Sequence, residues 1–251
     1  MVKLPGREHR KRAALTAAGA GVVLIVGAFL LVYFVIFPTS SPKPFKLTST
    51  VASTPAAGVT SSTSAAAVSS AGSSQSWRVA SGSQAGYRVR EKLAFLPAES
   101  DAVGRTSDIA GAATLTDSTN RLTITAASFT VAVSTLKSDR SMRDEKIHEI
   151  GLESSRYPTA TFVLSKAVAL PASVSSGDVA RVSVAGVFDI HGTSKLQTLP
   201  VEFVVSGSTL EAAGSLTFPW SEFGMTAPSV GGFVSVTGKA TMEFDLRLQR
   251  A

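Results

Sequence analysis

The sequence predicts an all-β domain, either an antiparallel β-barrel or a β-sandwich, from Trp77 to the C-terminus. Along most of this stretch apolar and polar residues alternate with a period of two, as they do in half-buried strands. Short turns rich in Gly, Ser, Asn and Asp separate the alternating runs. Only one segment, Arg140–Leu152, favours a helix. About seven to nine antiparallel strands with short connections are typical of up-and-down barrels and of sandwiches.

The clearest strands carry apolar residues on one face, which we expect to point into the core. They are Val182–Ile190, Leu199–Val205, Leu210–Trp220 and Ala240–Leu248. Small residues also lie on faces predicted to point inward, namely Ala126, Gly186, Ala212 and Gly214. Such residues could leave room for a slender ligand, because a barrel of about eight strands is wide enough to hold one. Alternatively, large residues opposite fill the gaps, and the pattern alone slightly favours such a filled core.

One strand is predicted to change face part-way along its length. Leu122, Ile124 and Ala126 share one face, whereas Phe129, Val131 and Val133 share another. A β-bulge inserts an extra residue and re-aims the side chains that follow it. We therefore expect a bulge at Ala127–Ser128.

The segment Arg140–Leu152 predicts a short helix laid over one end of the sheet. Ser138, Asp139 or Ser141 can begin it, since these side chains cap helix N-termini. Gly151 is expected to end it in the left-handed conformation, which glycine adopts at little cost. Pro158 then favours extended backbone before it, and the chain re-enters the sheet at 159–164.

The N-terminal region predicts a single membrane anchor. Residues 1–12 form a short basic segment, and residues 13–37 contain no charged residue. A helix of that length spans about 37 Å, enough for a hydrocarbon core of about 30 Å. Basic residues stay on the cytoplasmic side, so we expect a cytoplasmic N-terminus and an extracytoplasmic C-terminal domain in the cell membrane. The alternative is a cleaved signal peptide, but its apolar core is normally shorter.

Residues 38–76 predict a disordered linker. Ser, Thr, Ala and Pro dominate this stretch, and such a composition buries too little apolar surface to offset chain entropy. As a flexible coil it would span about 35 Å. The predicted organisation is therefore a basic segment (1–12), a transmembrane helix (13–37), a linker (38–76) and a folded domain (77–251).

Charge and cysteine content exclude several classes of site. The net charge is +6, but seven of the 24 Lys and Arg residues and only one of the 18 acidic residues precede Trp77. The folded domain is therefore formally neutral, which gives no support to nucleic-acid binding. The chain has no cysteine, which excludes disulfides, thiolate metal sites and a cysteine nucleophile.

Catalytic and metal motifs are weak in this sequence. His148 and His191 are the only histidines of the domain, and they could meet Asp144, Glu145 or Asp189. However, no H-x-x-x-H spacing and no G-x-S-x-G motif is present. Arg143 and Asp144 are expected to form an ion pair or a helix-end contact. We expect no enzyme activity, no metal and no cofactor.

Six short motifs follow one another in order between Trp77 and about Arg250. They are Trp77 with the strand 83–89, Val103-Gly104-Arg105-Thr106 with Ile109-Ala110-Gly111, Met142-Arg143-Asp144, Tyr157-Pro158-Thr159-Ala160-Thr161-Phe162, Gly186-Val187-Phe188-Asp189-Ile190-His191-Gly192-Thr193 and Phe223-Gly224. No single motif is specific, but in this order they resemble the YceI-like, polyisoprenoid-binding family.

The resemblance implies an extended lipocalin-like antiparallel β-barrel with one short helix. It also implies an elongated apolar cavity that holds an isoprenoid chain, such as a polyprenyl lipid or a quinone tail. The residues expected to line it are Phe129, Phe162, Phe188, Phe203, Phe218, Trp220, Gly186 and Ala212. Arg143, Asp144 and His148 are expected at the cavity mouth.

Two departures from the family pattern concern the polar end of that cavity. Glu145-Lys146-Ile147 replaces the His and Leu that usually follow the Arg-Asp element. Trp220-Ser221-Glu222 replaces the basic residue usual before the late Phe-Gly turn. The polar end is therefore expected to recognise a different head group, or none.

These observations leave three hypotheses for the function of the protein. The first is a membrane-tethered extracytoplasmic protein that binds an isoprenoid or a similar long-chain lipid. The second is a ligand-free cell-envelope module that contacts a protein partner. The third is an enzyme that uses the region of His148 and His191. An apolar cavity favours the first, and a filled core favours the second.

Overall fold

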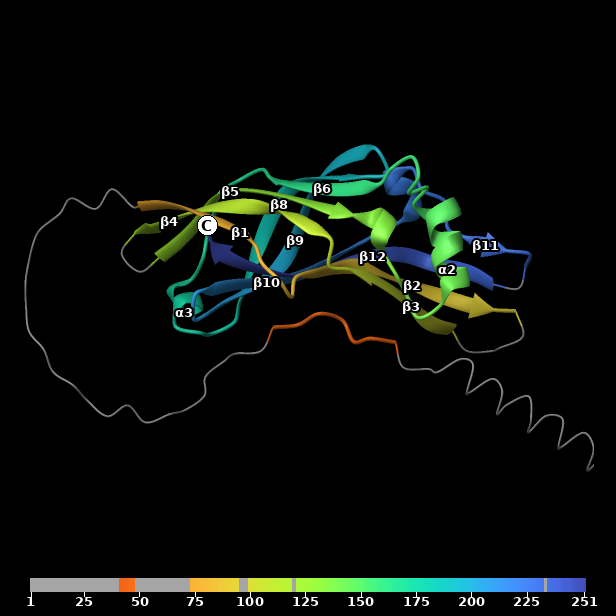
Figure 1. Cartoon of the computed structure of the whole chain (residues 1–251), viewed down its shortest axis with the longest axis horizontal. Coiled ribbons are helices and arrows are strands. Elements are labelled where there is room, and N and C mark those ends of the chain that lie inside the picture. The colour runs from red at the N-terminus through yellow and green to blue at the C-terminus, as the bar shows by residue number, and fades with distance from the viewer. Residues whose placement is uncertain (1–40, 48–72, 95–98, 119–120, 233) are drawn as a thin grey trace, which may run out of the picture. The chain divides into compact units, whose positions relative to one another are not determined.

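The computed structural model describes residues 41–47, 73–94, 99–118, 121–232 and 234–251 (Figure 1). The chain divides into two compact units, Met1–Ser41 and Pro42–Ala251, and every described helix and strand belongs to the second. Within the described residues, no helix has the length and apolarity to cross a membrane. The predicted anchor, 13–37, lies outside these residues.

Twelve strands form a single antiparallel sheet. They are β1 (Ser73–Val79), β2 (Gln84–Leu93), β3 (Glu99–Thr106), β4 (Ile109–Ser118), β5 (Arg121–Ala132), β6 (Thr159–Leu164), β7 (Val168–Ala169), β8 (Ala180–Ile190), β9 (Thr193–Ser206), β10 (Thr209–Phe218), β11 (Ser229–Val230) and β12 (Val234–Arg250). The helical turns are η1 (Val133–Thr135), α2 (Ser141–Lys146), η2 (Ile147–Gly151), α3 (Ala172–Ser175) and η3 (Trp220–Phe223).

Eight of the strands close into a barrel, in the order β1-β4-β5-β6-β8-β9-β10-β12. The ring closes where Trp77–Val79 of β1 pairs with Leu248–Arg250 of β12. Closure leaves no free edge around this ring, which removes the row of unpaired backbone groups that an open sheet would expose. The predicted antiparallel barrel is confirmed, and it replaces the sandwich alternative.

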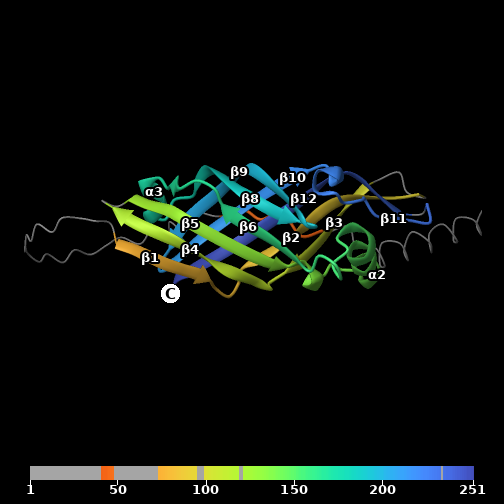
Figure 2. The ribbon, with the colours of Figure 1, turned by 90° about the horizontal axis from the view of Figure 1, so that it is seen from above.

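The long strand β12 extends the barrel beyond this ring (Figure 2). Its first part, from Val234 to Asp245, pairs with β2, and β2 pairs in turn with β3. A bridge between Arg105 of β3 and Lys137 then brings β3 next to the chain that follows β5. One end of the interior is therefore walled by β1 and β4, and the other by β2 and β3.

The predicted bulge in β5 is displaced toward its N-terminus. Thr114 pairs with Ala126 and the next residue, Leu115, pairs with Ile124, so the extra residue is Thr125. As a result Ile124 is buried, whereas Ala126 is exposed. The prediction that Ala126 points inward is wrong, because the bulge reverses the alternation before this residue rather than after it.

The predicted helix forms, but the conformation at its end differs from the prediction. After α2 the chain continues as one π-helical turn, in which the Leu152 amide donates to the carbonyl of Ile147 at 2.7 Å. Gly151 is buried and does not adopt a positive φ, whereas Glu153 has φ +43°. The helical segment therefore ends at Gly151 as predicted, but the residue with a positive φ lies two positions later, at Glu153. The single-turn helix α3 is not predicted by the sequence.

The folded unit also extends into the stretch predicted as a linker. Strand β1 begins at Ser73, four residues before the predicted boundary. Residues 42–47 contact the outside of the barrel through hydrogen bonds to β2, β3 and β9. Residues 48–72 lie outside the described residues.

Candidate functional site

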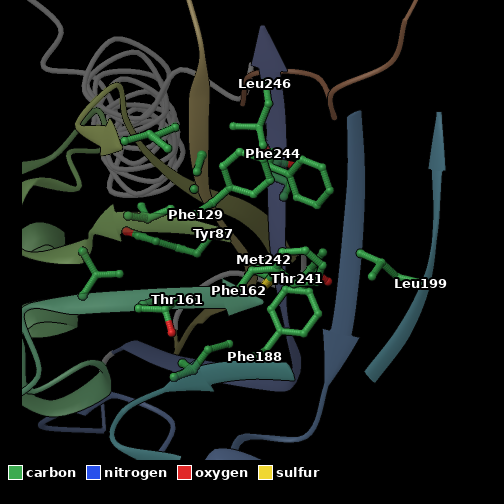
Figure 3. Close-up of a pocket in the computed structure, with 18 of the residues that line it drawn as sticks. Tyr87, Phe129, Thr161, Phe162, Phe188, Leu199, Thr241, Met242, Phe244 and Leu246 are labelled. Atoms are coloured by element: carbon green, nitrogen blue, oxygen red, sulfur yellow. The ribbon is translucent and has the colours of Figure 1, made fainter. Parts of the chain in front are cut away.

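A cavity of about 190 Å³ lies inside the barrel and is lined almost entirely by apolar side chains (Figure 3). The alternation of β12 supplies one wall, since Ala240, Met242, Phe244, Leu246 and Leu248 follow one another on its inner face. β2, β4, β5, β6, β8, β9 and β10 supply further walls. Ile147 and Leu152 reach the cavity from the helical segment, which therefore covers part of it.

Three phenylalanines form a row across one wall of the cavity. Phe129 of β5 pairs in register with Phe162 of β6, and Phe162 pairs with Phe188 of β8. The ring centroids of the first pair are 6.4 Å apart, and those of the second are 4.8 Å apart. Cross-strand aromatic neighbours stabilise a sheet and hold one another in place. The row gives the cavity a rigid aromatic wall.

Gly186 and Gly214 are covered by aromatic rings and so do not widen the cavity. A Cβ added to Gly186 would lie 2.1 Å from Cε2 of Phe162, and one added to Gly214 would lie 2.8 Å from Cζ of Phe244. Gly186, which the sequence predicts in the lining, does not border the cavity, because the Phe162 ring covers it; its role toward a ligand stays a prediction. Ala212, which pairs with Phe203, does line the cavity.

The remaining predicted wall residues also lie where the sequence places them. Phe203, Phe218 and Trp220 border the cavity, and Phe203 and Phe218 are buried. Their roles toward a ligand stay predictions. The predicted set omits Tyr87 and Met242, although their inward position follows from the same alternation.

Two polar atoms of the lining, the Tyr87 hydroxyl and Trp220 Nε1, make no hydrogen bond of good geometry among the described residues, although the Ser138 side chain lies near enough to the Tyr87 hydroxyl to oppose the rise of its pKa. Burial raises the pKa of the Tyr87 hydroxyl above its ordinary value, so it stays protonated and can donate. Buried donors are nearly always satisfied in folded proteins. Both atoms are therefore available to an acceptor on a bound molecule.

The three residues predicted at the mouth lie on the helical segment, but they do not line the cavity. Arg143 donates from Nε and Nη2 to the two carboxylate oxygens of Glu91 at 2.9 and 2.8 Å. Asp144 accepts hydrogen bonds from the amide and the hydroxyl of Ser138 at 2.8 and 2.6 Å. These contacts fasten the helical segment to β2 and to the chain after β5, so the two residues support the element that carries Ile147.

His148 has a similar supporting position. Its Nε2 lies 3.0 Å from the carbonyl of Leu136, and its Nδ1 lies 2.9 Å from the hydroxyl of Ser154. A carbonyl can only accept, so Nε2 donates to it, and the second ring nitrogen is engaged by Ser154. Ser154 is buried, which keeps its hydroxyl away from an external substrate.

Residues 77–248 match the family model of the YceI-like domain. The chain belongs to the YceI-like family. The predicted resemblance is thereby confirmed for the folded domain.

Several solved structures are similar to this chain at low sequence identity. A polyisoprenoid binding domain from Saccharophagus degradans, implicated in plant cell wall breakdown, is 13% identical with a TM-score of 0.51, over 70% of this chain and 99% of that one. BcnA from Burkholderia cenocepacia is 21% identical with a TM-score of 0.47, over 66% and 95% of the two chains. A mutant Campylobacter jejuni YCEI protein is 12% identical with a TM-score of 0.43, over 63% and 84%. A search of curated proteins gives no match.

The second histidine of the YceI-like domain lies in a strained turn. His191 has φ +55°, its ring centroid is 4.2 Å from that of Tyr157, and its Nε2 is 3.3 Å from Glu153 Oε1 without the alignment of a hydrogen bond. Within the described ranges, no three His, Cys, Asp or Glu side chains come together in a way that could hold a metal ion. The arrangement gives no support to the enzyme hypothesis.

Proposed function

We propose that this protein binds an isoprenoid or a similar long-chain lipid inside the barrel, on the extracytoplasmic side of a membrane to which its N-terminus anchors it. The observation that carries this proposal is the cavity with its nearly continuous apolar lining. Apolar interiors of this kind exclude water and accept apolar ligands. The similarity to a polyisoprenoid binding domain gives independent support.

The main driving force for binding would be burial of the lipid chain. Each square ångström of apolar surface removed from water contributes about 25 cal/mol, before the entropic costs of association. The row Phe129–Phe162–Phe188 limits the width of the chain that the cavity admits. A slender, unbranched or methyl-branched chain fits such a wall better than a fused-ring lipid.

The two unpartnered donors favour a ligand with an oxygen acceptor. Tyr87 lies within electrostatic range of Arg143, Asp144 and Glu91, which places its hydroxyl toward the helical segment. A carbonyl or hydroxyl oxygen of a quinone or a prenyl alcohol would satisfy such a donor. The lipid head group is therefore assigned to this end of the cavity in the proposal.

The cavity disfavours the two other functions. A ligand-free partner-binding module needs no internal space, and a filled core would serve it better because voids destabilise a domain. An enzyme needs accessible, converging catalytic groups, whereas His148 and Ser154 are engaged in a structural turn.

The membrane anchor rests on the sequence of residues 1–37. An apolar span without charged residues follows a basic segment, which supports a cytoplasmic N-terminus. Such an anchor would hold the barrel close to the bilayer that supplies its ligand.

Intrinsic fluorescence can test lipid uptake. The chain has two tryptophans, of which Trp220 borders the cavity and Trp77 does not. In the full-length Trp77→Phe variant, a quinone with an isoprenoid tail should quench Trp220 fluorescence saturably. Adding Ala212→Phe should abolish quenching, because the new ring occupies the cavity.

A matched control separates occlusion from a general effect of the larger side chain. Ala126→Phe adds the same ring to an exposed position on β5, so quenching should persist. Equal quenching in both Ala→Phe variants, or no saturable quenching in any, would contradict lipid binding in the barrel.

A further inference from the structure

A buried charged cluster lies on the outside of the barrel. Glu243 of β12 is only 3% exposed, although its neighbours Met242 and Phe244 face the interior. Its Oε1 accepts a hydrogen bond from Arg105 Nη2 of β3 at 2.9 Å, and its Oε2 accepts one from Arg88 Nε of β2 at 3.3 Å. A carboxylate on the outer face of a barrel is ordinarily exposed to water, so other parts of the chain must shield Glu243.

Residues 42–47, which we call the docking segment, lie over this cluster (Figure 1, orange). Arg88 Nη2 donates to the carbonyl of Pro42 at 2.6 Å, and Arg105 Nη2 donates to the carbonyl of Lys43 at 2.6 Å. The guanidinium carbon of Arg105 also lies 3.9 Å from the centroid of the Phe45 ring. Each arginine thus binds Glu243 and the docking segment at the same time, and its Nη2 donates to both.

The contact continues along the wall to a third position. The amide of Leu47 donates to Glu202 Oε2 of β9 at 3.2 Å. Glu202 pairs across the sheet with Ala213 of β10, which in turn pairs with Asp245 of β12. The docking segment therefore crosses several strands of the wall and is held at both of its ends.

The sequence of the docking segment suits this binding mode. Extended segments with two prolines have no internal hydrogen bonds, so their carbonyls are free to accept from an arginine. Pro42 and Pro44 also restrict the unbound chain, which lowers the entropic cost of docking. Arginine is the side chain best able to serve a carboxylate, a carbonyl and an aromatic face together.

We propose that the outer face of β2, β3 and β12 is a receptor for the docking segment, and that docking fixes which side of the barrel faces the membrane. Only residues 38–41 separate the predicted span from the docking segment, a length of at most about 14 Å. The orientation rests on the proposed membrane anchor, whereas the docking itself does not.

Limited proteolysis of the full-length protein in detergent tests the docking. Trypsin cleaves after Lys46, while Pro44 protects the bond after Lys43. Phe45→Ala removes the ring beneath Arg105 without touching the barrel, and cleavage after Lys46 should become about tenfold faster, the change expected from loss of one good contact. Leu196→Ala, which truncates an exposed apolar residue on β9, should leave the rate unchanged.

Rapid cleavage after Lys46 in the unmodified protein, equal to that in Phe45→Ala, would overturn the docking. A second substitution in the receptor, Arg105→Gln, should accelerate cleavage as Phe45→Ala does. Circular dichroism of each variant reports whether the barrel remains folded, so a loss of structure cannot imitate a loss of docking.

Spin labels in liposomes test the orientation, and the natural absence of cysteine permits single labelling sites. Ser215→Cys places a label on β10 opposite Glu243, and Val163→Cys places one on exposed β6, across the barrel. In phosphatidylcholine liposomes with a nickel-chelating lipid, relaxation should be stronger at position 215 than at 163. Phe45→Ala should remove the difference. Equal relaxation in the unmodified background would overturn the orientation, and neither readout depends on lipid uptake.

Discussion

The two faces of β12 differ in how their polar groups are satisfied. On its inner side, Met242 and Phe244 face a cavity in which the Tyr87 hydroxyl and Trp220 Nε1 lack partners. On its outer side, Glu243 has two arginine partners, and the same arginines bind residues of the chain's own N-terminal segment. The charges around Glu243 are therefore paired within the chain, whereas the inner side keeps donors that a bound molecule would satisfy under the proposed function.

The largest effect is expected from removing the carboxylate of Glu243 on the outer side of β12. Glu243→Ala leaves Arg88 and Arg105 without their shared carboxylate. We expect a loss of about 3 kcal/mol in the free energy of unfolding, the lower end for a broken buried ion pair because both arginines keep some contact with water. Urea unfolding measures it. A loss below about 1 kcal/mol would show that the cluster is not a stabilising element.

On the inner side, Gly186→Ala should be the most disruptive small change. The added methyl would clash with the Phe162 ring, which must leave its place in the aromatic row. We expect destabilisation of about 2 kcal/mol, typical of overpacking, measured by thermal unfolding. Ala126→Gly, at an exposed site, provides a comparison in which no ring moves. An unchanged melting temperature in Gly186→Ala would mean that the ring is free to move into the cavity.

Tyr87→Phe tests whether the Tyr87 hydroxyl donates a hydrogen bond to an oxygen of the bound lipid. Removing an unpaired hydroxyl should leave stability unchanged or raise it slightly. The Kd for a quinone-tailed lipid should rise about tenfold, whereas the Kd for a hydrocarbon chain of the same length should not change, because only the former offers an acceptor. Fluorescence titration of both ligands distinguishes the cases. Equal effects on the two would assign Tyr87 to shape alone.

The smallest effect concerns a second outer carboxylate on β12. Burial raises the pKa of Asp245, and its Oδ1 has no hydrogen-bond partner among the described residues. The folded state therefore holds this proton more tightly than the unfolded state, so stability falls as pH rises from the ordinary value of 3.8 through the raised folded pKa. Asp245→Asn should stabilise the protein at pH 7 by less than about 1 kcal/mol.

The control for this prediction is a carboxylate of opposite behaviour. Burial alone would raise the pKa of Asp101, but hydrogen bonds from Arg90 and Arg88 outweigh it and lower this pKa overall. Asp101→Asn should therefore destabilise the protein at neutral pH, and its effect should fade as pH falls below 3.8. Unfolding curves at several pH values that give both substitutions the same sign would contradict the assignment.

The period-two alternation was sufficient to predict the barrel and most of its inner wall. Phe129, Phe162, Phe188, Phe203 and Phe218 all border the cavity, because strand geometry alone determines which face they share. Alternation does not reveal what lies opposite a small residue. For this reason Gly186 was assigned to the wall, although the ring of Phe162 covers it. In addition, the bulge lies at Thr125, before the predicted Ala127–Ser128, and so turns Ala126 outward.

The mouth and the docking segment depend on contacts between distant parts of the chain. Arg143 donates a hydrogen bond to Glu91, and Arg105 donates one to the carbonyl of Lys43. In each case more than fifty residues of sequence separate the partners. Composition assigned Lys43 to a disordered linker, since a few contact-forming residues are diluted by Ser, Thr and Ala around them. The arginines that bind residues 42 and 43 come together only when β2 and β3 form the barrel wall.

The most direct test of the inner site is native mass spectrometry of the full-length protein released from its own membrane, with extraction and identification of bound lipid. We predict one prenyl lipid or quinone per chain, lost in Ala212→Phe and retained in Ala126→Phe. A chain that emerges without lipid, and that takes up no added isoprenoid, would contradict the account.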